Sequence, residues 1–599
     1  MCGICGIYNF NNQKIQKSQL QAMNDQMINR GPDSEGYFID DNFGMAMRRL
    51  SIIDIEKNIQ PMKSDNENIS VIFNGEIYNF LELREEMKTK NIKFKTNGDT
   101  EVILKLYEKF GERFIHKMIG MFSVCIFDKI NKKILIYRDR FGIKPLYYHL
   151  TKDSFYFSSS LFSLKKILNL KKSEESFFLY LCFNYFPSSK SVYEDVHSLL
   201  PGNLLRIENN KLTIEKYYDI SKDIGNLDTN DYDPKIFKKI IKDSVYINLR
   251  SDVDLGLMMS SGIDSSIIAK ESSDLNRNLK AYTVNFQDKD DNESELASKF
   301  ANELRINHET INLNKDEAPF LLNQILKNMD EPSADTAIIP SYLISEKAKK
   351  DNIKVLLSGA GGDEVFAGYG RHYLNFFSFF YGIINFLKFK DHKLLKMFPY
   401  KIQNILFKSL NKKFAYVCNT SGQNLGVLLG LISNNSHSRI LQFIEKILDE
   451  MISHSFIFDA KNIIKADLSL YLPDNILRPF DKVSMISSVE GRVPFLDHRF
   501  FEIINYYNIN MASKGSKTNN KKILRDLYKN ELPDYILKNH KKGFNAPLEK
   551  WNLDFSQFNL NEYFEDSLNI KLINDNIENK NFRSFNYNLN TYKIWAEFN

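Results

Sequence analysis

The sequence predicts a two-domain protein, with an α+β domain at residues 1–215 and a doubly wound parallel α/β domain at residues 234–599. Three observations support this fold class. The chain has 599 residues, 43% of them hydrophobic, and this number of apolar side chains exceeds what one core of ordinary size holds. Its first part contains apolar runs with a period of two, and its second part alternates short apolar runs with helical patterns.

The N-terminal part predicts antiparallel strands with a few helices, because its apolar residues alternate with polar ones and turn residues interrupt the runs. Examples are NISVIFNGEIYNF (68–80) and GMFSVCIFDKINKKILIYRDRFG (120–142). Within the second run, DKINK (128–132) separates two apolar stretches and predicts a hairpin loop. The polar stretch 221–233 has few core-forming residues, so we place the domain boundary there.

The C-terminal part predicts a parallel sheet, because short apolar runs alternate with helical segments. From about Tyr369 onward the segments are predicted to be mainly helical. An apolar run at 374–387 is too short for a membrane span, so we expect a buried helix there. The alternation is carried by LGLMM (255–259) and SSIIAKES (265–272), AYTVNF (281–286) and SELASKFANEL (294–304), and IKVLLSG (353–359) before a Gly-rich turn.

Composition excludes several classes of partner. The chain has 80 Lys and Arg against 75 Asp and Glu, a net charge of +5 with both signs interspersed, which argues against nucleic acid. Its five cysteines are too scattered for a disulfide framework, and the N-terminus does not have the pattern of a signal peptide. We therefore expect a cytoplasmic protein that acts on small molecules without a membrane partner, and a homodimer is compatible with the sequence.

Cys2 is a candidate nucleophile, because removal of Met1 would leave a thiol and a free α-amine on one residue. The amine has an ordinary pKa of about 7.7 to 8.0 and is able to act as the base for its own thiol. Three alternatives stay open for this residue taken alone. Cys2 is a small buried apolar residue, or it forms a C-x-x-C redox or metal pair with Cys5, or its position is chance.

The surrounding motifs resemble the class II glutamine amidotransferases, and specifically the N-terminal glutaminase domain of asparagine synthetases. They are MCGICGIY (1–8), RGPDSEG (30–36), RRLSIID (48–54), QPM (60–62), NGEIYNF (74–80), GDTEVIL (98–104) and RDRFGIKPLYY (138–148). The resemblance implies an αββα sandwich of the N-terminal nucleophile type. It further implies that the Asn74 side chain and the Gly75 N–H form an oxyanion hole for attack by Cys2. Arg49, Glu76 and Asp99 would then hold the α-carboxylate and α-amine of glutamine.

A second candidate site begins at MMSSGIDSS (258–266), where an apolar strand enters a Ser/Gly turn and then a helix. Backbone N–H groups at such a turn bind phosphate well. This is not a Walker A loop, because no Gly-Lys-Ser/Thr follows. Taken alone, a Ser/Gly turn before a helix is usually only a helix cap.

The wider pattern resembles the ATP-pyrophosphatase synthetase domain of asparagine synthetases. The matching segments are MDEPSADTAIIPSYLIS (329–345), LLSGAGGDEVFAGY (356–369), YLPDNIL (471–477), DKVSM (481–485), EGRVPFLDHR (490–499) and KKGFNAPLEKW (541–551). The resemblance implies ATP and Mg²⁺, with Asp264 and Asp363 holding the metal. Lys541 would neutralise charge on the departing pyrophosphate. The implied pyrophosphate pocket is Ser260, Ser261, Gly262, Ser265 and Ser266, and the implied nucleotide contacts are Met259, Val284, Ser358 and Gly359.

Four residues depart from the family pattern. Asn29 stands where His is common, and Ser160 stands where Glu is usual. Ser261 replaces a Gly and so must adopt a backbone angle that a Cβ tolerates. Ala360 replaces a usually acidic residue expected to contact the acyl-adenylate, with Glu364 as a nearby candidate to substitute for it.

The resemblance as a whole implies a glutamine-hydrolysing carbon–nitrogen ligase that converts aspartate to asparagine and forms AMP and pyrophosphate. Because of Ala360, a second acceptor stays open, such as a uronic acid sugar in surface polysaccharide synthesis. A third alternative is a degenerate binding or regulatory protein. That alternative is disfavoured by the presence of every expected nucleophilic and charged residue, namely Cys2, Asn74, Asp264, Asp363 and Lys541.

Overall fold

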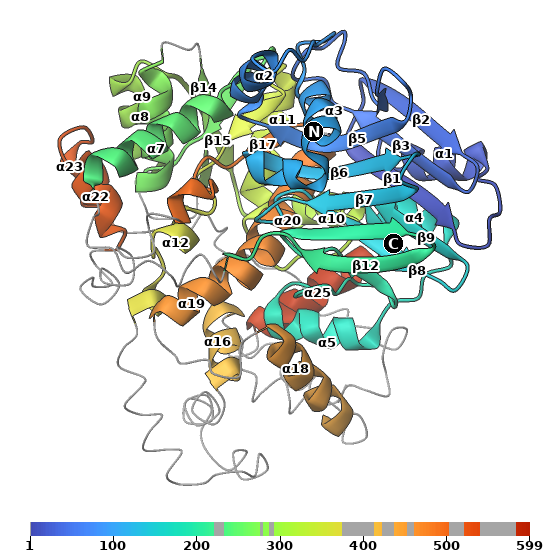
Figure 1. Cartoon of the computed structure of the whole chain (residues 1–599). Coiled ribbons are helices and arrows are strands. Elements are labelled where there is room, and N and C mark those ends of the chain that lie inside the picture. The colour runs from blue at the N-terminus through green and yellow to red at the C-terminus, as the bar shows by residue number, and fades with distance from the viewer. Residues whose placement is uncertain are drawn as a thin grey trace.

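The computed structural model describes two layered regions joined along a broad interface (Figure 1). The described residues are 2–220, 233–275, 279–286, 293–373, 412–421, 437–451, 460–501, 520–539 and 583–599. The predicted boundary stretch 221–233, apart from Asp233, and the apolar run 374–387 lie outside them. Among the described residues, no helix is both long and apolar enough to cross a membrane.

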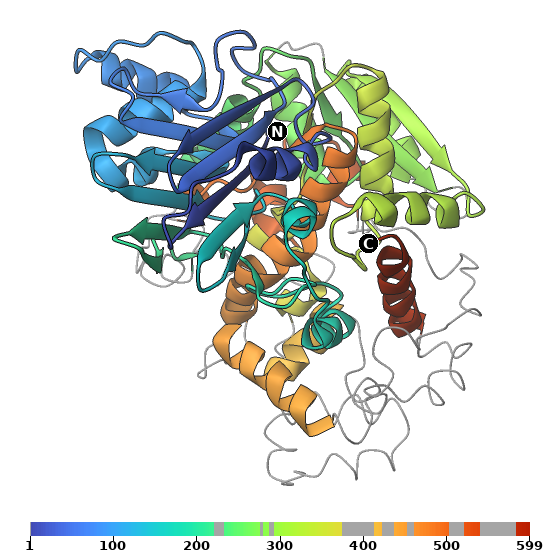
Figure 2. The same ribbon diagram turned by 90° about the vertical axis from the view of Figure 1, so that its right-hand side faces the viewer.

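The N-terminal domain consists of two stacked antiparallel sheets between helical layers, as expected for an αββα sandwich (Figure 2). The first sheet has the order β10 (Val196–Ser198), β8 (Tyr147–Leu150), β9 (Ser154–Ser158), β1 (Gly3–Asn9), β3 (Phe43–Arg49) and β2 (Ser34–Asp40). The second has the order β12 (Lys211–Lys216), β11 (Asn203–Glu208), β7 (Lys133–Arg138), β6 (Gly120–Asp128), β5 (Ile69–Ile77) and β4 (Met62–Lys63).

Period-two alternation produces the layers of this domain. Ile4 of β1 and Ile72 of β5 belong to one core cluster between the sheets, whereas Ile7 of β1 packs on the outer face with Leu20 of α1. The predicted hairpin is confirmed, since β6 and β7 pair antiparallel around residues 129–132. The helices of this domain are α1 (Lys17–Asp25), α2 (Phe80–Lys88), α3 (Asp99–Phe110), the 3₁₀ helix η1 (Gly111–Lys117), α4 (Leu161–Ile167) and α5 (Glu174–Phe183).

The C-terminal domain is built on a fully parallel sheet, as predicted. Its order is β15 (Asn307–Leu313), β14 (Lys280–Phe286), β13 (Leu255–Met258), β16 (Val355–Leu357) and β17 (Glu490–Arg492). Leu257 and Leu357 belong to the same core cluster as Ile267 of α8, whereas Leu356 belongs to that of Ile344 of α11. The sheet is therefore buried on both faces, which explains why its strands are almost continuously apolar.

The helices around this sheet include several far from it in sequence. They are α7 (Pro234–Asn248), α8 (Ile263–Ser273), α9 (Glu293–Glu303), α10 (Ala318–Asn328), α11 (Ile338–Lys350), α12 (Gly362–Val365), η2 (Gly370–Tyr373), α16 (Lys412–Ser421), α18 (His437–Met451), α19 (Ala460–Ala466), the π-helix η3 (Asp467–Leu477), α20 (Arg478–Ile486), α22 (Lys522–Tyr528), α23 (Asp534–Leu537) and α25 (Arg583–Phe598). The prediction of mainly helical structure after Tyr369 misses β17, a three-residue strand too short to show a period.

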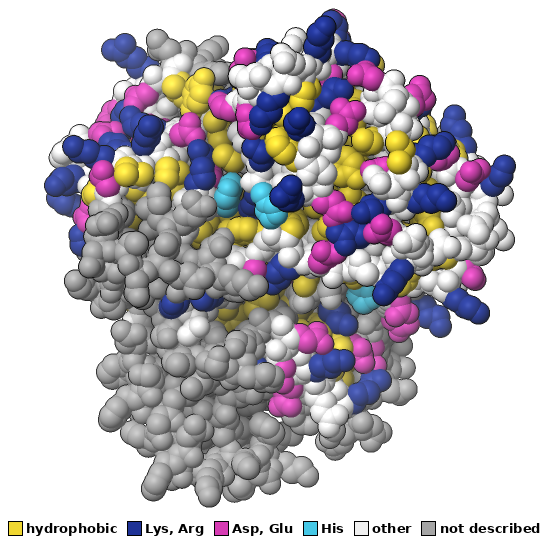
Figure 3. Space-filling view, in the orientation of Figure 1, with side chains coloured by type: hydrophobic (Ala, Val, Ile, Leu, Met, Phe, Trp, Pro, Cys, Tyr) yellow, Lys and Arg dark blue, Asp and Glu magenta, His cyan; other side chains and the backbone are white. Residues whose placement is uncertain are grey.

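Local sequence signals begin the second domain. Asp233 is the N-cap of α7, its carboxylate accepts the Lys235 N–H at 2.8 Å, and Pro234 occupies the first turn. On the described part of the face seen in Figure 3, cationic and anionic side chains lie side by side, without a large patch of either sign.

Candidate active sites

The first candidate site surrounds Cys2, which lies just before β1 and is 6% exposed. Its backbone N–H donates to Asn74 Oδ1 over 3.1 Å. Because the amide oxygen faces Cys2 N, the Nδ2 group of Asn74 is the donor of this side chain, and it lies 3.4 Å from Ser159 Oγ. Gly75 follows with φ +147°, and a Cβ there would lie 1.9 Å from the Met121 carbonyl oxygen. Only glycine fits at this point of β5.

The C-x-x-C pair does not form a joint thiol site. Cys2 belongs to the core between the two sheets, whereas Cys5 lies on the opposite face of β1 in a different core cluster. The part of the chain that the structure describes also contains no group of three or more His, Cys, Asp or Glu residues able to hold a metal. Burial raises the pKa of the Cys2 thiol, and Arg49 opposes that rise. A neutral thiol needs a base nearby before it becomes a nucleophile.

Three charged residues predicted to bind glutamine lie around Cys2. The Arg49 guanidinium donates to the carbonyl oxygens of Ile53, Asp54 and Ile55 at 2.8 to 3.1 Å, which fixes its position. Arg49 and Glu76 both act electrostatically on the Cys2 thiol. Asp99 in turn acts on Glu76, so the three charges belong to one cluster.

Burial sets the protonation of the two acids in this cluster. The Asp99 carboxylate accepts from the Ile77 N–H at 3.1 Å and from Asn58 Nδ2 at 3.0 Å, yet burial raises the pKa of Asp99 to about 6. Burial and the charge of Glu490 raise the pKa of Glu76 well above its ordinary value. A ligand ammonium placed between these acids would lower both pKa values.

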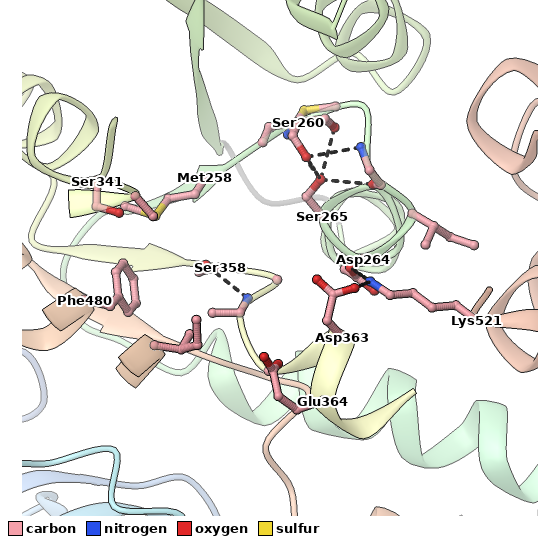
Figure 4. Close-up of a pocket in the computed structure, with 18 of the residues that line it drawn as sticks. Met258, Ser260, Asp264, Ser265, Ser341, Ser358, Asp363, Glu364, Phe480 and Lys521 are labelled. Atoms are coloured by element: carbon pink, nitrogen blue, oxygen red, sulfur yellow. Dashed lines mark hydrogen bonds and ion pairs between the residues drawn. The ribbon is translucent and has the colours of Figure 1, made fainter. Parts of the chain in front are cut away.

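The second candidate site is a pocket of about 270 Å³ where the loops after β13 and β16 meet (Figure 4). β13 pairs with β14 on one side and with β16 on the other, so the pocket lies at the topological switch point of the sheet. Its lining includes Met259, Ser260, Ser261, Gly262, Asp264 and Ser265 from the first loop and Ser358, Gly359, Ala360, Gly361, Asp363 and Glu364 from the second.

The first loop is held open by its own serines. Ser265 Oγ accepts the Ser260 N–H at 3.1 Å, and Ser260 Oγ accepts the Gly262 N–H at 3.1 Å. Ser261, the departure from Gly, is absent from the residues with positive φ, so its backbone tolerates a Cβ. Its Oγ accepts from Asn539 Nδ2 at 2.8 Å. The loop leads directly into α8, whose N-terminal N–H groups suit an anion.

The two predicted metal ligands are brought together by Lys521. Its ammonium forms ion pairs with Asp264 and, at 2.7 Å, with Asp363 Oδ1, and its side chain is 4% exposed (Figure 4). Both carboxylates raise the pKa of Lys521 against the opposing effect of burial. Gly359 and Gly362 let the second loop approach Asp264 closely, because a Cβ at either position would lie only 2.7 to 2.9 Å from the Asp264 side chain.

These carboxylates fit Mg²⁺. Hard oxygen donors from one or two carboxylates, completed by substrate phosphates, are the usual protein site for this ion. The position between Asp264 and Asp363 already requires positive charge, since Lys521 occupies it.

Not every predicted residue lines the pocket. Ser266 is fully buried in α8, and Val284 on β14 is 8% exposed, and neither belongs to the lining. Lys541, with the whole motif 541–551, lies outside the described residues. The lining residues that sequence reasoning missed include Lys521, Asn539, Asp335 and Tyr369. Asp335 and Tyr369 stand inside motifs already quoted, but nothing in the sequence alone distinguishes Lys521 from its neighbour Lys522.

The two departures in the N-terminal domain make contacts between the domains. Ser160 Oγ donates to Asp330 Oδ2 at 2.9 Å, and the Asn29 carbonyl oxygen accepts from Ser488 Oγ at 2.7 Å. These positions therefore serve the domain interface, and neither contacts Cys2 or Asn74 in the described hydrogen bonds. Ala360 lines the pocket of the C-terminal domain.

Arg492 lies between the two sites. Its guanidinium is fully buried, lies 3.5 Å from Glu76 and donates to Glu490 at 2.7 Å. Its carbonyl oxygen accepts the Ser358 N–H at 2.8 Å, at the start of the second pocket loop. One residue thus contacts both the acid cluster near Cys2 and the pocket loop.

Comparison with known proteins agrees with this division into two sites. A glutamine amidotransferase domain matches residues 1–218, and an asparagine synthase domain matches residues 237–571. The chain is 32% identical to asparagine synthetase [glutamine-hydrolyzing] 1 of Bacillus subtilis, over 92% of this chain and 88% of the relative. It is 35% identical to putative asparagine synthetase [glutamine-hydrolyzing] 2 of Methanocaldococcus jannaschii, over 62% of this chain and 76% of the relative.

Among solved structures, the glutamine phosphoribosylpyrophosphate amidotransferase of B. subtilis matches 52% of this chain and 65% of its own, with 14% identity and a TM-score of 0.28. The asparagine synthase domain matches more than half of the chain, and the Bacillus relative aligns with most of it. With Cys2 against Asn74 in one domain and a phosphate-loop pocket in the other, the chain belongs to the asparagine synthase family.

Proposed function

We propose that this chain makes asparagine from aspartate, glutamine and ATP, in a glutaminase domain at residues 1–215 and a synthetase domain at residues 234–599. The observation that carries the proposal is the pocket at the switch point, where a serine-rich phosphate loop meets two carboxylates. The similarity to asparagine synthetases over most of the chain favours aspartate over the uronic acid sugar.

In the first reaction, the Cys2 thiolate attacks the side-chain amide carbon of glutamine. The α-amine freed by loss of Met1 takes the thiol proton, which burial otherwise retains. The Nδ2 group of Asn74 and the Gly75 N–H hold the developing oxyanion, while Arg49, Glu76 and Asp99 hold the ends of glutamine. Ammonia leaves, and water hydrolyses the thioester to give glutamate.

In the second reaction, an oxygen of the aspartate β-carboxylate attacks the α-phosphorus of ATP, and the bond to the β-phosphate breaks. The loop of Ser260 to Ser265 holds the phosphates, and Lys521 with Lys541 balances the charge of the departing pyrophosphate. Asp264 and Asp363 would hold Mg²⁺, which supplies charge neutralisation at the phosphates when bound. Ammonia then attacks the acyl carbon, AMP leaves, and a proton passes from the nitrogen to a base.

A cytoplasmic location and small-molecule substrates complete the proposal. Support comes from the five cysteines, which are few, scattered along the sequence and buried in the structure. A homodimer stays a prediction from the sequence.

The test is pyrophosphate release with ATP and ammonium, with aspartate beside glucuronate and galacturonate as acceptors. We expect pyrophosphate, AMP and asparagine with aspartate alone. Release with a uronic acid but not with aspartate would overturn the proposal, and release with neither would favour a binding protein.

The division of labour is tested with Cys2→Ala, which should lose glutamine hydrolysis and keep ammonium-dependent synthesis. Cys5→Ala is the matched control, because Cys5 lies on the opposite face of β1 and should keep both activities. Glutamine hydrolysis by Cys2→Ala would refute the nucleophile. A mass spectrum showing that the active enzyme retains Met1 would refute the assignment of the Cys2 α-amine as the base.

A further inference from the structure

One side of the C-terminal pocket is acidic, and the two reactions proposed above do not use its carboxylates. Asp335 and Glu364 both line the pocket, with the aromatic rings of Tyr369 and Tyr471. Burial raises the pKa of Tyr471, and the charges of both carboxylates add to that rise, as expected for groups that line the same pocket. The same lining contains Ala360, where the family pattern has an acid.

Glu364 already has a strong protein partner. The Tyr369 hydroxyl donates to Glu364 Oε1 at 2.5 Å, and the Glu364 side chain is 1% exposed. The short turn that carries Glu364 also carries Asp363, which pairs with Lys521. Its position and hydrogen bond are therefore fixed by the protein itself.

Asp335 differs from the other acids of the pocket. Its Oδ1 accepts the Ala337 N–H at 3.0 Å, and within the described ranges no Lys, Arg or His forms an ion pair with it. Burial raises the pKa of Asp335 to about 6, opposed only by that hydrogen bond. By contrast, Asp264 and Asp363 share the ammonium of Lys521. Asp335 is only partly exposed, at the wall of the pocket. A partly desolvated carboxylate without a counter-charge is stabilised by a ligand that brings a cationic group.

The position of Asp335 suits the end of the acceptor opposite to the reacting carboxylate. Asp335 lies three residues before the start of α11, which carries Ser341, and Ser341 lies across the pocket from Asp264 and Lys521 (Figure 4). The reacting carboxylate must approach the phosphates near Asp264. A cationic group at the other end of the acceptor would then face Asp335.

We propose that Asp335 binds the α-ammonium of an amino-acid acceptor and so provides the acidic contact that Ala360 lacks. The inference rests on the proposed function and makes the pocket selective for α-amino acids. A uronic acid sugar offers only hydroxyl groups at this end, which leave the charge of Asp335 without compensation.

The test compares Asp335→Asn with the wild type in ammonium-dependent pyrophosphate release, with ATP saturating. Aspartate and succinate serve as acceptors or competing ligands, because succinate is aspartate without the amino group. In the variant, KM for aspartate should rise about 10- to 100-fold, the size of a charge-assisted hydrogen bond. The KM or inhibition constant of succinate should stay the same or fall. The KM for ATP should not change, and neither should the rate of glutamine hydrolysis.

Asp316→Asn is the matched control, since Asp316 is exposed and outside the pocket lining. The melting temperature of Asp335→Asn distinguishes lost binding from misfolding. It should stay the same or rise, because the substitution removes a poorly compensated charge. An unchanged KM for aspartate in Asp335→Asn, with an active wild type, would overturn the inference alone. A wild type that activates only a uronic acid would overturn the proposed function and the inference together.

Discussion

Lys521 connects the stability of the C-terminal pocket to its proposed metal. Replacement by Met removes the ammonium between Asp264 and Asp363 and keeps most of the side-chain volume. Breaking a buried ion pair costs about 3 to 5 kcal/mol. The two carboxylates are 16% and 23% exposed, so we expect the lower end, about 3 kcal/mol. At about 2 °C per kcal/mol for a large domain, the melting temperature should fall by about 6 °C.

Mg²⁺ without nucleotide should restore part of this loss in Lys521→Met. At a hundredfold excess over its dissociation constant, a ligand stabilises the folded state by about 2.7 kcal/mol. In the wild type, Mg²⁺ must displace the Lys521 ammonium before it binds both carboxylates, so its stabilising effect should be smaller. Differential scanning fluorimetry with and without Mg²⁺ measures both effects.

Lys522→Met is the control, because Lys522 is 38% exposed and pairs only with Asp526 among the described ion pairs. Its melting temperature should change little with or without Mg²⁺. The reasoning is refuted if Mg²⁺ shifts Lys521→Met and the wild type equally, or if Lys521→Met melts at the wild-type temperature.

Three further predictions concern the N-terminal site and the interface. Asn74→Ala should reduce glutaminase kcat by about 10² to 10³, since it removes an oxyanion donor; a change of only a few fold would place that donor elsewhere. Because the pKa of Asp99 is about 6 without ligand, Asp99 becomes protonated below that pH and loses its attraction for the glutamine ammonium. The KM for glutamine should therefore rise as pH falls through about 6, and a flat profile would contradict this role. Arg492→Met leaves Glu490 and Glu76 buried without their shared cation, so chemical denaturation should show a loss of about 3 to 5 kcal/mol, with a weaker affinity for glutamine. Unchanged stability would show that other groups compensate.

Local patterns in the sequence were enough to predict most elements that frame the sites. Period-two runs predicted β5, β6 and β7, and the alternation of short apolar runs with helices predicted β13, β14 and β16. These predictions succeeded because alternation and burial on both faces leave a direct trace in neighbouring residues. β17 was missed because three residues are too few for a period, and its place in the sheet depends on pairing with β16, more than 130 residues earlier in the chain.

The sequence by itself determined the chemical inventory: a cysteine at position 2, an Asn-Gly pair, a serine-rich phosphate loop and two aspartates in glycine-rich surroundings. Each of these signals is local, because the residues that form it are neighbours in the chain. Only the tertiary structure decided that Lys521 forms ion pairs with both Asp264 and Asp363. Lys521 and Asp264 are 257 residues apart in the chain. The tertiary structure also decided that Arg492 contacts both sites and that Asp335 lines the pocket without an ion pair to any Lys, Arg or His that the structure describes. These facts depend on which charges share a buried space, and spacing along the chain carries no record of that.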